Sequence, residues 1–286
     1  MKKLLAILVI VVIGFLGWLN WERIAFVISP LAGVQQSAGT TSQPGTVTLA
    51  SAPNPRYRYA LLDPTTSTDE SFRESMKSKL AASVRNYVPD KPKDTKNGVE
   101  ELVGIHMVLR MVGTLPLQYG APEYTIDIPS VPALPARPDM TKPGALDPRS
   151  DYDQWKHAQN AWSEQYNAAT AAAEQATATL QGVELNVDGW SAVTAGVVSL
   201  ALLAPADGDV AFLVMSDLDE NQPQQPAAFN GHPLVVVQPD PVGDVSRWDS
   251  LFNSFSSWSA SNGSGDITRV RPEASDTTIR AFVKGA

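Results

Sequence analysis

Residues 60–72, ALLDPTTSTDESF, place a group of oxygen-bearing side chains directly after a short apolar run. Asp63, Thr65 and Ser67 form the pattern D-x-T-x-S, which is the only D-x-[ST]-x-[ST] match in the chain. Hard divalent cations prefer oxygen ligands, and alternate residues of a loop that leaves a strand can direct their side chains at one point. The stretch therefore predicts a site for Mg²⁺, with Mn²⁺ and Ca²⁺ as alternatives.

A further acidic residue, Asp217, ends a second apolar run, DVAFLVMSD at residues 209–217. In open α/β sheets, ligand sites lie outside the carboxyl ends of the strands. Both Asp63 and Asp217 follow a predicted strand, so we expect their side chains to lie close together. Two hydroxyls and few carboxylates would leave a bound cation electrophilic, so a carboxylate from another molecule can complete its shell.

The elements that position these residues alternate along the chain. Apolar runs predict strands at residues 56–62, within 102–112, at 123–128 as a short edge companion, at 209–217, at 233–240 and from Asp266 onward. Helical spacing of apolar residues predicts helices at 72–87, 151–180, 190–203 and 247–258. This alternation predicts an α/β fold with a three-layer, doubly wound, mostly parallel sheet.

A proline-rich segment interrupts this alternation. Six prolines between residues 129 and 148 exclude regular structure there, and the Ala-rich helix at 151–180 follows. One stripe of that helix is formed by Tyr152, Trp155, Trp162, Tyr166 and Ala169. We expect the stripe to pack on the domain, so that residues 129–181 form an insertion in it.

The loop after the first strand and the turn Ser216-Asp217-Leu218 together resemble the metal-ion-dependent adhesion site of von Willebrand factor A (VWA) domains. In that family a D-x-S-x-S loop, a Thr from a second loop and an Asp from a T-D-G-like turn hold a divalent metal. The resemblance covers residues 56–286 and implies a VWA- or Rossmann-like fold. It also implies a metal held by Asp63, Thr65, Ser67 and Asp217, and a protein partner that contributes an acidic side chain.

The second loop departs from the family pattern. Val187 and Asp188 stand where the Thr is expected, with Ser191 and Thr194 further along as weaker candidates. We include Asp188 among the predicted ligands. A carboxylate there would make the site more anionic and tolerant of Ca²⁺, or the site is partly degenerate. Leu218 replaces the Gly of the last turn.

Two alternatives to a metal-dependent binding site stay open. In the first, Thr65, Ser67 and Thr68 cap the helix that begins near Asp69, with Asp63 in an Asx turn, and the domain is a metal-free VWA-like scaffold.

In the second, the chain is a haloacid-dehalogenase-like, Mg²⁺-dependent phosphohydrolase. Asp63 would be its nucleophile, assisted by Thr114, Asp217 and Asp219. That family usually has a second Asp two places after the nucleophile, where this chain has Thr65, and no lysine follows in the expected setting. We therefore predict a binding or assembly module and not an enzyme.

The N-terminus carries the features of a membrane anchor. Lys2 and Lys3 precede an apolar run at residues 4–19, which would rise about 24 Å as a helix, and Trp18 and Trp21 close it. Small residues suited to signal-peptide cleavage do not follow, although cleavage stays an alternative. We predict a single-pass anchor at residues 1–23, in contact with the membrane through residues 4–21, with the N-terminus cytoplasmic.

Residues 24–55 are predicted to form a flexible stalk, and residues 56–286 the domain outside the cytoplasm, either periplasmic or on the cell surface.

Composition excludes several functional classes. The chain has no cysteine, which rules out disulfides and thiolate metal sites. A formal charge of −8, with no cluster of basic and aromatic residues, argues against nucleic-acid binding. The three histidines are far apart in the sequence and lack metal-ligand spacing.

Overall fold

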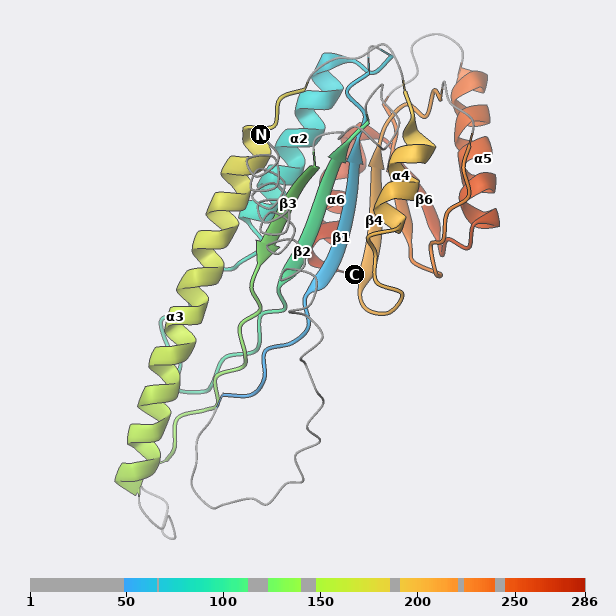
Figure 1. Cartoon of the computed structure of the whole chain (residues 1–286). Helices are drawn as coiled ribbons and strands as arrows, with labels where there is room; N and C mark the ends of the chain where they lie inside the picture. The colour runs from blue at the N-terminus through green and yellow to red at the C-terminus, as the bar shows by residue number, and fades with distance from the viewer. Residues whose placement is uncertain are drawn as a thin grey trace, which may run out of the picture. The chain divides into compact units, whose positions relative to one another are not determined.

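The computed structural model describes residues 49–65, 67–112, 123–139, 148–185, 191–220, 224–239 and 245–285. These residues form an α/β domain around a mixed, mostly parallel sheet with the strand order β3-β2-β1-β4-β5-β6 (Figure 1). The parallel strands are β1 (Arg56–Leu62), β2 (Ile105–Met111), β4 (Val210–Met215), β5 (Leu234–Val237) and β6 (Ile267–Val270). The predicted mostly parallel sheet is confirmed, and β3 (Glu123–Ile128) is the expected edge companion, antiparallel to β2.

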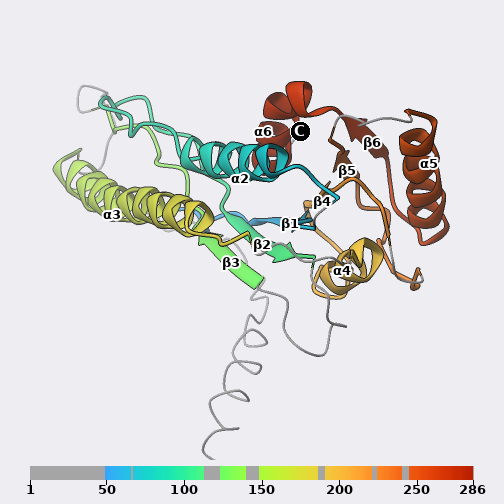
Figure 2. The same cartoon turned by 90° about the horizontal axis from the view of Figure 1, so that it is seen from above.

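Helices cover both faces of the sheet (Figure 2). The helices α2 (Glu70–Arg85), α3 (Pro148–Gln181) and α6 (Ser275–Lys284) share one apolar core, and α4 (Val193–Ala201) and α5 (Val245–Ser261) share the other. Alternate residues of β1 face the two cores, with Ala60 and Leu62 on one side and Tyr59 and Leu61 on the other. A strand buried on both faces needs a continuous apolar run, which is what β1 has.

The helix α6 and the short 3-10 helix η3 (Pro272–Ala274) before it were absent from the sequence-based prediction. The signal for α6 was present, because Ile279, Phe282 and Val283 follow helical spacing and all three are buried. The remaining predicted helices and strands form, with ends that differ by a few residues from those expected.

The long helix α3 confirms the predicted Ala-rich helix and its buried stripe. Trp155, Trp162, Tyr166 and Ala169 are buried, and Tyr152 is partly buried. The aromatic side chains of the helix fix it to the segment that follows α2 and to the segment that follows β3. Trp155 donates to the carbonyl of Pro135 at 2.9 Å, and Tyr166 donates to the carbonyl of Pro89 at 2.8 Å. The stripe therefore packs on the domain, as predicted.

Close packing holds α4 against β1. A Cβ atom on Gly196 of α4 would lie 2.8 Å from Cδ1 of Leu61, which is shorter than real side-chain contacts. Glycine thus allows the helix backbone to approach the strand closely. This approach brings the N-terminal end of α4 to the end of β1 that Asp63 follows.

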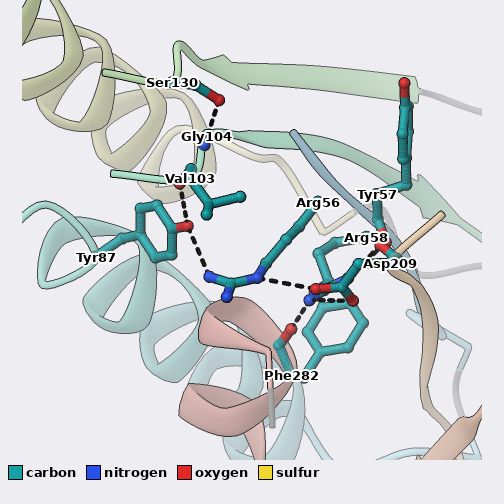
Figure 3. A network of polar contacts seen from close by, with 9 residues as sticks. All are labelled: Arg56, Tyr57, Arg58, Tyr87, Val103, Gly104, Ser130, Asp209 and Phe282. Atoms are coloured by element: carbon teal, nitrogen blue, oxygen red, sulfur yellow. Dashed lines mark hydrogen bonds and ion pairs between the residues drawn. The ribbon is translucent and has the colours of Figure 1, made fainter. Parts of the chain in front are cut away.

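At the opposite end of the sheet, a polar network ties the beginning of β1 to α6 and to the residues next to α2 and β4 (Figure 3). Arg58 is 1% exposed, and its guanidinium pairs with Asp209 at 2.9 Å and donates to the carbonyl of Phe282 at the end of α6. Arg56 also pairs with Asp209 at 2.9 Å and donates to the hydroxyl of Tyr87 at 3.2 Å. Burial lowers the pKa of Arg58, and the charge of Asp209 opposes that effect.

No helix among the described residues is both long and apolar enough to cross a bilayer. The predicted anchor lies outside the described residues, as does the stalk up to residue 48.

Asp209→Ala tests the polar network at the start of β1. We expect it to lower the free energy of unfolding by about 2 kcal/mol, since it leaves the buried Arg58 without its anionic partner. Urea denaturation of the full chain in mild detergent measures the change. Asp207→Ala removes an exposed carboxylate two residues away and should change stability by less than about 0.5 kcal/mol. Equal stability of the two variants would contradict the assigned role of Asp209.

Candidate functional site

Asp63 and Asp217 lie beyond the ends of neighbouring strands. Parallel pairing sets Leu62 of β1 beside Met215 of β4, and the N–H of Asp63 continues the ladder by donating to the carbonyl of Met215 at 3.0 Å. The strand order reverses between β1 and β4, which is where open α/β sheets place their ligands. The expectation that the two acidic residues meet at one edge of the sheet agrees with this geometry.

The loop after β1 is held by its own hydrogen bonds. Asp63 Oδ1 accepts from the N–H of Thr65 at 3.0 Å, which is the Asx turn considered from the sequence. Thr68 Oγ1 donates to the carbonyls of Asp63 and Thr65 at 3.0 and 2.9 Å. The hydroxyls of Thr65 and Ser67 lie 2.9 Å from each other, with Thr65 buried and Ser67 exposed. Both hydroxyls therefore belong to one local cluster of oxygens.

Asp69, and not the preceding hydroxyls, caps helix α2. Its side chain accepts from the N–H of Ser71 at 2.7 Å. Capping of this helix by Thr65, Ser67 and Thr68 is therefore wrong. The Asx turn at Asp63 is present, and the metal-free scaffold stays a prediction.

Asp63 also joins the loop after β1 to two other loops. Its side chain is fully buried, and Oδ2 accepts from the hydroxyl of Ser216 at 2.6 Å and from that of Ser191 at 3.2 Å. Ser191 precedes α4 and Ser216 follows β4. Of the two weaker candidates in the second loop, Ser191 is thus the one that reaches Asp63.

Asp217 is 1% exposed and belongs to the same cluster through its hydrogen bond with Ser67. Burial raises the pKa of Asp217 to about 6, and the charge of Asp63 adds to this effect. Hydrogen bonds from the N–H of Asp219 and the hydroxyl of Ser67 oppose it. Gln238, after β5, donates to the carbonyl of Asp217 at 3.0 Å and so fixes the backbone of the turn.

The turn after β4 contains a strained residue at the position that differs from the family pattern. Leu218 has a φ of 64°, in the left-handed region, where a residue other than Gly costs about 1 kcal/mol. Its N–H donates to Ser216 Oγ at 2.9 Å, and its side chain is buried in the core under α4 and α5. Packing and this hydrogen bond therefore hold the turn without Gly.

Sequence reasoning missed two residues that hold this region. Arg73 of α2 donates to the carbonyls of Thr65 and Thr68, and these hydrogen bonds fix the loop after β1 to the first turn of α2. The carboxylate of Glu220 accepts from the N–H of Thr194 at 2.9 and 3.2 Å. Burial raises the pKa of Glu220, the hydrogen bond from Thr194 opposes this, and the charge of Asp63 adds to it. The only sequence signal for Glu220 was its place three residues after Asp217.

Two residues proposed from the sequence fall outside the described residues. Asp188 lies in the undescribed segment 186–190, and Thr114 lies in 113–122. The structure places neither of them.

The cluster offers oxygen ligands only. Its candidate ligands are the carboxylates of Asp63 and Asp217 and the hydroxyls of Thr65 and Ser67. Within the described ranges, no group of three or more His, Cys, Asp or Glu side chains could hold a metal. None of the ion pairs of those ranges involves Asp63 or Asp217. Two buried acidic side chains without a basic partner, beside two hydroxyls, fit a hard divalent cation.

Comparison with known proteins adds little to these observations. The sequence matches no protein-family model and no curated protein. A solved structure that is similar to this chain is the human COPII-coat protein Sec24c, with 10% sequence identity and a TM-score of 0.34. The match covers 88% of this chain and 37% of that one, and at this TM-score it carries no argument about function. The six-stranded mixed sheet itself is consistent with a VWA-like fold.

Asp217→Asn tests the electrostatics of the cluster in metal-free buffer. Because the folded-state pKa of about 6 lies above the ordinary value near 4, the carboxylate destabilises the fold progressively as pH rises between these values. The stability of the variant relative to the natural chain should therefore be about 2 kcal/mol more favourable at pH 7 than at pH 4. Urea denaturation in EDTA at the two pH values measures this. A difference that does not change with pH would contradict it.

Proposed function

We propose that this protein is a membrane-anchored, extracytoplasmic binding or assembly module that engages a protein partner through a divalent-metal site. The observation that supports the proposal most is the oxygen cluster at the ends of β1 and β4. There Asp63 and Asp217 are buried without a basic partner among the described residues, beside the hydroxyls of Thr65 and Ser67. Support comes from the position of the cluster, because the strand order reverses between β1 and β4 and open α/β sheets bind their ligands at such a point.

The residues of the cluster have different parts in this proposal. Asp63, Thr65, Ser67 and Asp217 hold Mg²⁺, or Mn²⁺ or Ca²⁺, directly or through water, and Asp188 is an additional candidate. Asp63 contributes negative charge and, through the hydroxyls of Ser191 and Ser216, keeps the three loops together. The bound metal would supply a positive centre that attracts an acidic side chain of the partner.

Binding without catalysis agrees better with the geometry of Asp63 than hydrolysis does. A phosphohydrolase would need Asp63 to attack a phosphorus atom, and the side chain has no exposed surface. Its Oδ2 already accepts two hydroxyl groups, and its Oδ1 accepts a backbone N–H. We therefore assign Asp63 an organising part in a binding site.

Melting of the full chain in mild detergent tests the metal site. Saturating Mg²⁺, Mn²⁺ or Ca²⁺ should raise the melting temperature, because a ligand that binds only the folded state stabilises it by about 2.7 kcal/mol at a hundred times its dissociation constant. Asp63→Ala and Ser67→Ala should each abolish or strongly reduce the rise. Ser67 is exposed, so its variant tests ligation with little risk to folding.

Asp69→Ala is the matched control for this experiment. The substitution removes the carboxylate that caps α2, which belongs to the same loop. It should lower the free energy of unfolding by about 1 kcal/mol and leave the metal-induced rise in melting temperature intact. No rise with any of the three cations in the folded natural chain would leave a metal-free VWA-like scaffold as the function.

Membrane attachment is tested by fractionation and N-terminal sequencing. The natural chain should sediment with membranes and keep Met1 or begin directly after it, because no cleavage signal follows the apolar run. A chain without residues 1–23 should lose the membrane association. A mature N-terminus near Gly33 or Gly39 would show that the segment is a cleaved signal peptide.

A further inference from the structure

The N-terminus of α4 holds a carboxylate from outside the helix. Its N-cap residue, Ala192, has no side chain that could accept a hydrogen bond. The carboxylate of Glu220, from the turn after β4, accepts from the N–H of Thr194 instead. A helix N-terminus favours anions because of its free N–H groups and the helix dipole. This contact shows which chemical group the position accepts, namely a carboxylate.

A second observation indicates that the position is incompletely satisfied. Thr194 is 1% exposed, and its Oγ1 has no hydrogen-bond partner among the described residues. A buried hydroxyl without a partner costs free energy, which an additional oxygen from a ligand would recover. The same residue therefore offers one group that Glu220 uses and one that it leaves unused.

The surroundings hold Glu220 only weakly. Glu220 is partly exposed, and no lysine or arginine of the described ranges forms an ion pair with it. The charge of Asp63 acts on it unfavourably. Its neighbour Asp219, in contrast, pairs with Arg247 at 2.6 Å. Of Asp219 and Glu220, Glu220 is thus the one that no ion pair of the described residues holds in place.

We propose that Glu220 is a resident competitor, which occupies the N-terminus of α4 until a carboxylate of the protein partner displaces it. This inference rests on the proposed function, since it assigns the acidic partner group a place beside the metal. It makes Glu220 an autoinhibitory residue that lowers the affinity for acidic partners. Release of Glu220 frees the N–H of Thr194 for the incoming carboxylate.

Acetate is a suitable probe, because it carries the partner's proposed group and nothing else. The melting temperature of the full chain in mild detergent is measured against acetate concentration at constant ionic strength, with chloride as the reference anion and saturating Mg²⁺ present. Glu220→Ala should respond at acetate concentrations about tenfold lower than the natural chain, the change expected when one charged hydrogen bond no longer competes. Glu220→Gln, which keeps the size and a weaker acceptor, should lie between them.

Asp219→Ala is the matched control, because it removes the same charge from the same turn and leaves the contact between Glu220 and Thr194 in place. It should respond to acetate like the natural chain. If both alanine variants gain equally, the effect is one of net charge, and if neither gains while Mg²⁺ still stabilises all chains, Glu220 is only a helix cap. Either result overturns the inference.

A failure of the proposed function gives a result that differs from a failure of this inference. In that case Mg²⁺ stabilises none of the chains, and the acetate titration is repeated without metal. A tenfold gain confined to Glu220→Ala would then still support the resident carboxylate, and its absence would overturn it.

Discussion

The parallel pairing of β1 with β4 is the constraint on which the candidate site depends. The register that sets Leu62 beside Met215 also sets Asp63 beside Ser216 and Asp217, one step beyond the strand ends. A shift of one residue would turn the apolar side chains of β1 to the wrong faces. Because both faces of β1 are buried, that shift would disrupt two cores at once. The packing of the strand therefore fixes the geometry of its polar end.

The buried charges at the two ends of β1 differ in their partners. At its beginning, Arg58 is buried and neutralised by Asp209, and the carbonyl of Phe282 satisfies a further donor. At its end, Asp63 and Asp217 are buried beside hydroxyls, and neither forms an ion pair in the described part of the chain. A structural ion pair accounts for the first end. At the second end, hydroxyl and backbone N–H groups satisfy the carboxylate of Asp63, and the buried guanidinium of Arg73 donates to carbonyls of the same loop without forming an ion pair in that part of the chain.

The strands that are buried on both faces could be predicted from the sequence. Continuous apolar runs located β1, β4 and β5, and the acidic residues after them located the candidate site. Helix α6 was missed although Ile279, Phe282 and Val283 follow helical spacing, because three apolar residues in a short segment are a weak signal; the helix packs with α2 and α3 on one face of the sheet. The hydrogen bonds of Ser191, Ser216 and Glu220 could not be predicted, since they join loops that are distant in the sequence and depend on how closely α4 packs on β1.

The turn after β4 distributes its three acidic side chains among three surroundings. Asp217 points into the oxygen cluster, Asp219 pairs with Arg247 of α5, and Glu220 binds the N-terminus of α4. Three carboxylates at one point would repel one another strongly in a buried site. The strained backbone at Leu218 stays in place because its side chain is packed in the core, and it separates the directions of the residues on either side. The local strain thus limits the charge that the cluster must carry.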